Sequence, residues 1–193
     1  MEKLQKTKTY DELIDLLYYL DKAIEKHYPN SEIDVKLEVV GGFSLIYHGL
    51  RVVDQTTRDI DTLNEIEAKI WKIAHDIDSS NWLSDEPSSI LESLTQSVKD
   101  NIEFVKDTRY RFPYNHIHLW IATLSSVLGM KLNAMKIALD NGVLPEGYMR
   151  PQDIADFKDI IKAFGINSFE MLVAEYPHLQ EFENVVEKFA LFD

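Results

Sequence analysis

The chain has 193 residues, of which 45% are hydrophobic and 27% charged, and this composition excludes long disordered segments, collagen-like repeats and fibrous architectures. A formal net charge of −13 argues against a protein that binds polyanions nonspecifically by neutralising phosphates. Because cysteine is absent, disulfides, thiolate catalysis and cysteine-ligated metals are excluded, and a metal ion would need Asp, Glu, His or carbonyl oxygens as ligands.

The first half of the chain predicts helices that alternate with strands. Helices are indicated by apolar residues at three- and four-residue spacing, and strands by alternation of polar and apolar residues. The first helix has Thr9 and Glu12 in capping-box positions. In chain order, the expected elements are a helix over residues 10–28, a strand over 34–40, a helix over 43–50 and a strand over 59–63.

The second half predicts fewer strands and more helices. The expected elements are a helix over 65–77, a loop over 79–97 that opens a helix near Ile90, paired strands over 102–105 and 116–121, a helix over 125–140, and three short helices between 151 and 191 divided by Gly165 and Pro177. This order predicts an α+β (or α/β) fold with a small mixed β-sheet flanked by helices. We expect an α/β core over residues 1–122 and a helical C-terminal part over 123–193. No apolar stretch approaches the about 18 residues of a membrane span, so we expect a soluble cytoplasmic protein without a membrane partner.

Two short motifs concentrate the chemical information. Gly41 and Gly42 directly follow a strand, where glycines allow a tight turn, let a ligand approach the backbone and expose amides to a phosphate. Asp59 and Asp61 flank Ile60 in the next strand, so alternation places both carboxylates on one side and Ile60 in the core. Two carboxylates and substrate phosphates are a typical ligand set for Mg²⁺.

Each motif also has a simpler interpretation. A Gly-Gly pair alone is more often an ordinary loop, and an Asp-x-Asp alone is more often a solvated edge strand. Their occurrence together, in the order strand, Gly-Gly, helix and Asp-x-Asp strand, favours a functional site over both.

This combination resembles the DNA polymerase beta-type nucleotidyltransferase superfamily, in which a hydrophobic strand, Gly-Gly, a serine two residues later and a short helix precede Asp-hydrophobic-Asp. Residues 41–45, 49–51 and 57–61 look most like the small bacterial proteins that include abortive-infection nucleotidyltransferase toxins. A Leu-x-x-Lys-Leu-x-Ala segment over 128–134, followed by Arg-x-x-Asp-x-x-Asp over 150–156, is similar as well. The resemblance covers about residues 35 to 162.

The resemblance implies a role for individual residues. Gly41, Gly42 and Ser44 become candidates for holding a nucleoside triphosphate (NTP), and Asp59 and Asp61 for catalysis through bound Mg²⁺. Lys131 would contact phosphate or base, Asp153 would help to activate an acceptor hydroxyl, and Arg150 would neutralise charge that develops on the phosphates.

The superfamily places a third carboxylate on a neighbouring strand, and the matching segment over 116–121 contains no acid. Glu103 on the partner strand and His118 as a metal ligand are the alternatives. His116 and His118 share a strand face, but two histidines without a nearby Asp or Cys are more often partly buried polar residues than a zinc site.

The leading hypothesis is a Mg²⁺-dependent nucleotidyltransferase that moves a nucleoside monophosphate from NTP to a hydroxyl of RNA, protein or a small molecule. The resemblance implies a toxin–antitoxin or phage-defence setting with an antitoxin protein as partner. An RNA acceptor would need a local basic face, for which Lys106, Arg109 and Arg111 are candidates. The rival hypotheses are a catalytically degenerate relative that binds a nucleotide or a partner without turnover, and a purely structural or interaction protein, which the acidity of the chain favours.

Overall fold

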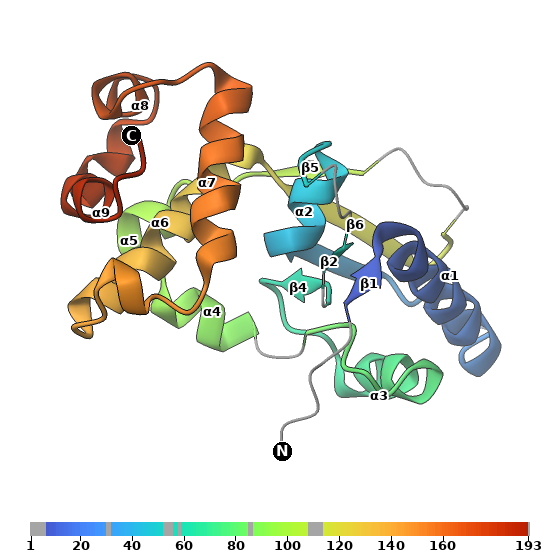
Figure 1. Ribbon diagram of the computed structural model, residues 1–193. Helices are drawn as coiled ribbons and strands as arrows, with labels where there is room; N and C mark the ends of the chain where they lie inside the picture. The colour runs from blue at the N-terminus through green and yellow to red at the C-terminus, as the bar shows by residue number, and fades with distance from the viewer. Residues whose placement is uncertain are drawn as a thin grey trace. The chain divides into compact units, whose positions relative to one another are not determined.

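Figure 1 shows the computed structural model, in which the described residues are 7–29, 32–51, 56–57, 59–84, 87–107 and 114–192. The chain forms two compact units. We name them the sheet unit (residues 1–91 and 104–122) and the helical unit (residues 92–103 and 123–193). A division after residue 122 alone would leave the segment 92–103 with the sheet, whereas its contacts group it with the C-terminal helices.

A mixed four-stranded sheet, in the order β4-β2-β6-β5, is the framework of the sheet unit. Its strands are β2 (Val35–Val40), β4 (Asp61–Thr62), β5 (Phe104–Lys106) and β6 (Ile117–Ala122). β2 and β6 run parallel, and each outer strand is antiparallel to its neighbour. A small second sheet pairs β1 (Lys8–Thr9) with β3 (Thr56–Thr57). The predicted α+β class and the predicted pairing of β5 with β6 are confirmed.

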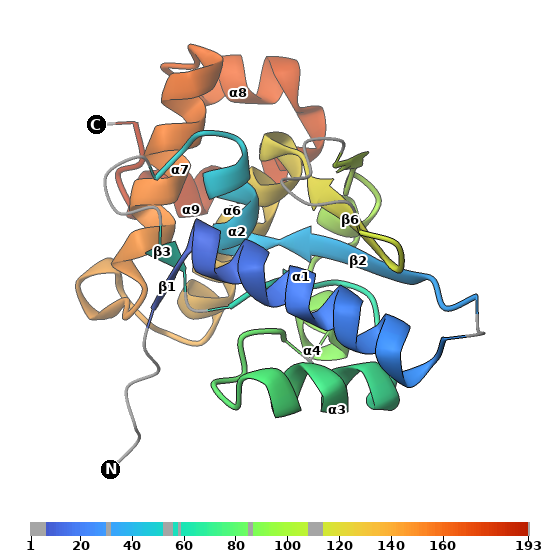
Figure 2. The ribbon, with the colours of Figure 1, turned by 90° about the vertical axis from the view of Figure 1, so that its right-hand side faces the viewer.

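Helices α1 (Tyr10–His27) and α3 (Ala68–Ile77) pack on one face of the four-stranded sheet (Figure 2). Alternation along β2 turns Val35, Leu37 and Val39 toward this face, where they join the buried leucines of α1 in one core. Burial of each such side chain contributes about 1.5–3 kcal/mol relative to exposure. The predicted capping box is present, since Thr9 accepts the Glu12 amide N–H and the Glu12 carboxylate accepts the Thr9 amide N–H.

A buried carboxylate ties α1 to the beginning of β6. Asp21 is completely buried and accepts backbone N–H groups of Asn115, His116 and Ile117 at 2.8 to 3.2 Å. A buried carboxylate is tolerated only when such donors replace its hydration. Sequence periodicity did not reveal this role, because Asp21 lies on α1 and its partners follow about 95 residues later.

Several elements of the sheet unit differ from the predicted bounds, β5 and β6 by one or two residues, and three of the differences have a local cause. Helix α2 (Gly41–Tyr47) begins at Gly41 and not at residue 43, because the left-handed Gly41 turns the chain within a single residue. β4 is only two residues long, because Ile60 forms a bridge with Leu83 and the Asn64 side chain binds the backbone of β2 after Thr62. Helix α3 begins at Ala68, after an extended residue at 67.

The helical unit consists of short helices around α6. They are α5 (Gln96–Lys99), α6 (Leu124–Asp140), α7 (Pro151–Phe164), α8 (Phe169–Glu175) and α9 (Glu183–Lys188), with 3-10 turns over Pro145–Gly147 and Pro177–Phe182. Helix α4 (Pro87–Ser93) leads into this unit from the predicted loop. Gly165 ends α7 in a left-handed conformation, and a new helical segment begins at Pro177, as predicted.

Asn133 of α6 holds the beginning of the segment 92–103. Asn133 is buried; its oxygen accepts the Thr95 amide N–H at 2.9 Å and its NH₂ group donates to the Ser93 carbonyl at 2.9 Å. A buried amide satisfied on both sides fixes the position of the segment.

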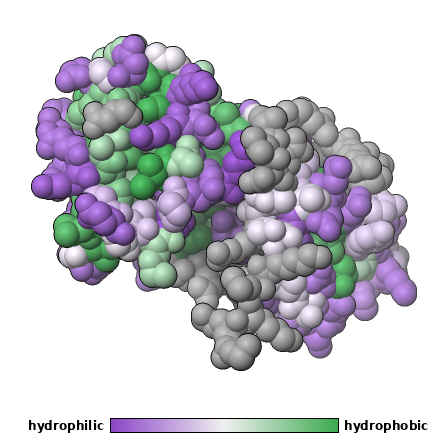
Figure 3. Space-filling model, viewed as in Figure 1, coloured by the Kyte–Doolittle hydropathy of each residue, from purple (hydrophilic) through white to green (hydrophobic). Residues whose placement is uncertain are grey.

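The surface of the helical unit is mixed. Figure 3 shows hydrophobic side chains interspersed with hydrophilic ones over these helices, and Leu144 and Met149 are exposed there. In the described part of the chain no helix has the length and apolar character needed to cross a membrane.

Candidate functional site

The Gly-Gly turn joins the end of β2 to the first turn of α2. Gly41 has a φ of +67°, a left-handed conformation that costs a residue with a Cβ about 1–2 kcal/mol. A Cβ at Gly41 would lie 2.5 Å from Oδ2 of Asp61, because Asp61 on β4 pairs with Val40 on β2. Glycine is therefore needed both for the backbone conformation and for the close approach of the Asp61 carboxylate. The sequence predicted that these glycines let a ligand approach the backbone; at Gly41, the group that approaches is the Asp61 side chain of the protein itself.

The second glycine is crowded by a cation and a hydroxyl. A Cβ at Gly42 would lie 2.6 Å from Nη1 of Arg51 and 2.6 Å from Oγ1 of Thr57. Sequence reasoning assigned Arg51 no role, because its place beside Gly42 depends on the course of the chain after α2 and not on a spacing. We name Gly41, Gly42, Arg51, Thr57 and Asp61 the turn cluster.

Asp59 and Asp61 flank the buried Ile60. Ile60 is completely buried, and its backbone donates to the Trp82 carbonyl at 2.7 Å and accepts from the Ser84 amide at 2.9 Å. The prediction that Ile60 points into the core is confirmed, while both aspartates are half-buried. Carboxylate oxygens such as theirs are the ligands that hard divalent cations prefer.

Ser44 lies inside α2. Its side chain is completely buried, and its hydroxyl donates to the Val39 carbonyl at 2.9 Å, which links α2 to β2. Contact with a triphosphate would require this bond to break. The nucleotide-binding role of Ser44 stays a prediction. Its hydrogen bond to Val39 gives Ser44 a structural role.

The strand beside β2 is β6, where the third carboxylate is expected. The register pairs Lys36 with His118 and Glu38 with Trp120, so these four side chains lie on the same sheet face as Val40 and Asp61. Glu38 is an acid on this face, and its carboxylate is 2.5 Å from the Lys36 ammonium. Over the described ranges, no group of three or more His, Asp or Glu side chains is arranged to hold a metal ion.

His118 and Glu103 are the two predicted alternatives for the third ligand. His118 pairs with Lys36, five residues before Gly41, which places it about 16 Å along the strand from the turn. That separation is too long for a shared metal ion, and Nε2 of His118 instead lies 2.6 Å from Oδ1 of Asp34. Glu103 belongs to the helical unit, where its amide N–H donates to Ser126 at 2.8 Å.

Lys131, Asp153 and Asp156 form a buried ion cluster in the helical unit. The Lys131 ammonium on α6 lies 2.6 Å from a carboxylate oxygen of each aspartate on α7. The exposed fractions are only 7%, 2% and 1%, so these charges persist in the interior because they are paired. For Lys131 to contact a phosphate or base, it would have to give up its ion pairs with two buried carboxylates.

Arg150 and Tyr148 complete the surroundings of Asp153. Nε of Arg150 lies 3.0 Å from Oδ2 of Asp153, and the Tyr148 hydroxyl donates to the same oxygen at 2.7 Å. Burial, followed by the hydrogen bond to Asp153, raises the pKa of Tyr148. The second motif of the sequence, which includes Lys131, Arg150 and Asp153, is thus brought together within the helical unit.

The predicted basic face is described only in part. Lys106 is exposed at the end of β5. Arg109 and Arg111, together with Arg58 of the Asp-x-Asp motif, lie outside the described residues.

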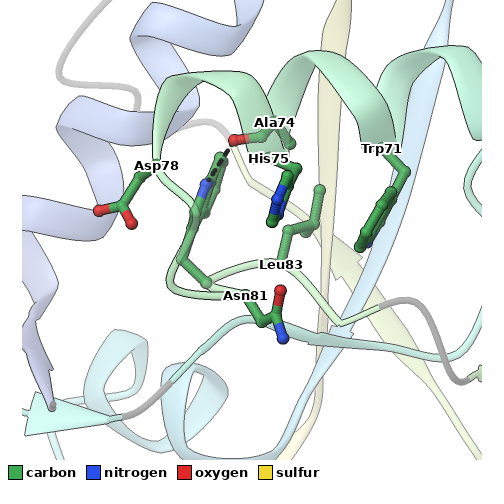
Figure 4. A pocket seen from close by; sticks show the side chains of 7 residues that line it. Trp71, Ala74, His75, Asp78, Asn81 and Leu83 are labelled. Carbon is green, nitrogen blue, oxygen red and sulfur yellow. Dashed lines mark hydrogen bonds between the residues drawn. The ribbon is translucent and has the colours of Figure 1, made fainter. Parts of the chain in front are cut away.

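Recesses occur in both units. Beside α3, a recess of about 10 Å³ has room for one water at most; its wall contains the parallel rings of Trp71 and His75 and the indole of Trp82, which donates to the Ala74 carbonyl at 3.0 Å (Figure 4). In the helical unit, open cavities of about 410 and 310 Å³ share Asn167, Leu191 and Phe192. None of the predicted site residues lines these three recesses.

Asp59 and Asp61 are the candidate donors for a hard divalent cation. Asp59 and Asp61 supply carboxylate oxygens, which Mg²⁺ prefers, and Mg²⁺ is usually held by one or two carboxylates together with substrate phosphates. Comparisons with protein-family models, with curated proteins and with solved structures give no match for this chain. Its function is therefore argued from these residues.

Proposed function

We propose that the chain is a Mg²⁺-dependent nucleotidyltransferase of the DNA polymerase beta type, with its reacting groups in the sheet unit. The observation that carries the proposal is the contact of the Asp61 carboxylate with the Gly41 turn, which requires a glycine at that position. This contact links the two motifs that the sequence separates by about 20 residues. A chance loop and a chance edge strand would not need to meet in this way.

The proposed reaction transfers a nucleoside monophosphate from NTP to an acceptor. The acceptor hydroxyl oxygen bonds to the α-phosphorus while the bond from that phosphorus to the bridging oxygen breaks. The bond electrons leave on pyrophosphate, and the hydroxyl proton passes to solvent. Asp59 and Asp61 would hold Mg²⁺, which when bound polarises phosphate oxygens. The chain's own contribution is to fix these carboxylates against a rigid turn, which positions the triphosphate.

Calorimetric titration of the protein with each of the four NTPs, with and without Mg²⁺, tests this proposal. We expect one NTP to bind in a Mg²⁺-dependent manner and Asp61→Asn to remove the Mg²⁺-dependent part of its affinity. Asp76→Asn, an exposed acid on α3, is the matched control and should bind as the wild type does. If no NTP binds the wild type, the proposal is wrong.

A second candidate function is nucleotide binding without turnover. The observation that favours it is the composition of β6. This strand lies beside β2, where the resemblance places a strand with the third carboxylate, but the face that it shares with Asp61 carries His118, Trp120 and Ala122. Pyrophosphate release from the bound NTP, measured with candidate RNA, protein and small-molecule hydroxyl acceptors, separates the two functions. Binding without release by any acceptor favours the second.

The biological setting stays a prediction. Cytoplasmic location, a toxin–antitoxin or phage-defence role and an antitoxin partner follow from the resemblance alone. Co-expression with the products of adjacent genes, followed by purification of any stable complex, tests for the antitoxin.

A further inference from the structure

A cavity of the helical unit lies between the end of α7 and the turn that follows α9. Its volume of about 410 Å³ is in the range of sites for small molecules. The apolar part of its wall is made by the buried Ile161, Ile166 and Leu191 and by the half-buried Phe192. Phe192 meets Phe157 of α7 edge to face, with ring centroids 5.7 Å apart, so packing holds this part of the wall in place.

The charged part of the lining is basic. Lys158 and Lys162 are one helical turn apart on α7, so they share a face of this helix. No Asp or Glu is among the described residues that line the cavity, although the chain has 33 acidic residues and only 20 basic ones. The cavity therefore combines apolar walls with local positive charge in a chain whose net charge is −13.

Lys162 is the cation that a ligand can use. Within the part of the chain that the structure describes, its ammonium group has no ion-pair partner. A lysine in the last turn of a helix often binds the carbonyl groups at the helix end. Here the Ile161 carbonyl already accepts the N–H of Ile166 at 2.9 Å, and the carbonyl of Lys162 itself accepts the N–H of Gly165 at 3.1 Å. These two carbonyls do not need the ammonium group, which can pair with an anion.

The adjoining cavity of about 310 Å³ has a lining of the opposite charge. It includes Glu170, Glu183 and Glu187, and it shares Leu191 and Phe192 with the first cavity. The two cavities therefore meet at apolar side chains, with lysines in one lining and glutamates in the other. A carboxylate is attracted to the lysines and repelled by the glutamates, so its apolar body would lie against Leu191 and Phe192.

We propose that the cavity of about 410 Å³ is a binding site for a small apolar monocarboxylate, which is independent of the nucleotide site proposed in the sheet unit. Lys162 pairs with the carboxylate, and Ile166, Leu191 and Phe192 cover the apolar body. The neutral amide of the same molecule keeps the apolar contacts without the charge, so it binds more weakly. The bound carboxylate also raises the melting temperature, because it binds only the folded state.

Titration of the protein with octanoate and with 2-naphthoate, followed by NMR of its backbone amides, tests the inference. The two probes distinguish an aliphatic from an aromatic ligand, and octanamide and 2-naphthamide are their neutral counterparts. We expect at least one carboxylate to shift the amide signals of residues 165–167. It should bind about 5- to 10-fold more tightly than its own amide, because only the carboxylate accepts a charge-assisted hydrogen bond.

Variants of the lining test the assignment of the charge. Lys162→Met should weaken the binding of that carboxylate by about 5- to 10-fold and leave the affinity of the amide within about twofold. Asn167→Asp places an acid in the lining and should also weaken the carboxylate alone. Lys188→Met is the charge-matched control, because it removes an exposed cation at the end of α9 that lines neither cavity, and it should change neither affinity.

The inference is wrong if neither carboxylate binds, or if the signals that shift lie outside residues 158–167 and 191–192. An amide that binds as tightly as its carboxylate contradicts it, as does a carboxylate whose affinity is unchanged by Lys162→Met. Melting curves show whether each variant is folded, and Asn167→Asp carries the test if Lys162→Met is not. None of these outcomes bears on NTP binding, which is measured separately.

Discussion

The turn cluster and the buried ion cluster are made of similar residues in different surroundings. In the turn cluster, Asp61 and Arg51 are half-buried and lie against a backbone that only glycine permits. In the buried ion cluster, Lys131 neutralises Asp153 and Asp156 in the interior of the helical unit. The sequence motifs mark residues of both groups as candidate site residues, but the charged side chains of the turn cluster are half-buried, whereas those of the buried ion cluster are almost completely buried.

The comparison teaches that pairing and burial decide between a structural and a functional role. A charge that is fully paired in the interior is expensive to redirect, because the partner left behind stays desolvated. A half-buried charge beside an open turn can change its partner at a small cost.

Replacing Lys131 should break the buried ion cluster and have the largest effect. We expect Lys131→Met to lower the free energy of unfolding by about 3–5 kcal/mol, because two buried carboxylates lose their ion pairs with Lys131. Lys136→Met is a control on the same helix: Lys136 pairs with Asp140 at the surface, and its loss should cost less than about 0.5 kcal/mol. Urea denaturation followed by far-UV circular dichroism measures both. If both variants lose a similarly small amount of stability, Lys131 is available for another role.

Adding a methyl group at Gly41 should disturb the turn cluster more than backbone strain alone explains. Gly49 provides the control, because it also has a left-handed φ but has no atom within 4 Å of an added Cβ. We expect Gly49→Ala to cost about 1 kcal/mol and Gly41→Ala about 2–3 kcal/mol, because the second Cβ also displaces Asp61. All three tryptophans lie in the sheet unit, so denaturation followed by tryptophan fluorescence reports on it. Equal losses would argue against a contact between Gly41 and Asp61.

The Lys8–Asp78 pair, of intermediate burial, should give the smallest effect and a distinct pH dependence. The hydrogen bond from Lys8 lowers the pKa of Asp78 from 3.8 to about 2, so the stabilisation is present above pH 4 and is lost as pH falls toward 2. We expect Lys8→Met to cost about 1 kcal/mol at pH 7 after allowance for solvent screening, and clearly less near pH 2, where about half of the Asp78 carboxyl groups are protonated. Lys69→Met, which removes an exposed pair with Glu67, is the control. A difference between wild type and Lys8→Met that does not change with pH would contradict this assignment.

The local elements were largely predictable, because their patterns reside in neighbouring residues. The capping box of α1, the alternation of β2 and the glycine stop of α7 each depend on residues within one or two turns. The bounds of β4 were wrong because its pairing is decided by Leu83 and Asn64, which periodicity within residues 59–63 does not reveal.

The candidate site was predictable in its motifs and less so in its partners. Gly41, Gly42 and Asp61 were identified from order and spacing, and the contact between Gly41 and Asp61 links them. Arg51 was missed because a left-handed backbone, which the sequence does not signal at an arginine, carries it to Gly42. The partners of Lys131 were not anticipated, because three charged residues give no signal of their burial.

The path of the chain between the two units has a consequence for synthesis on the ribosome. The segment 92–103 is made before β5 and β6, yet its Thr95 and Ser93 bind Asn133 of α6. During translation, residues 92–103 therefore have no contact with α6 until the sheet strands and α6 have emerged from the ribosome. A nascent chain arrested near residue 122 would therefore hold all four strands of the main sheet but none of α6. Cutting the gene at that point would leave both products incomplete, so the units can be separated only by also relocating residues 92–103.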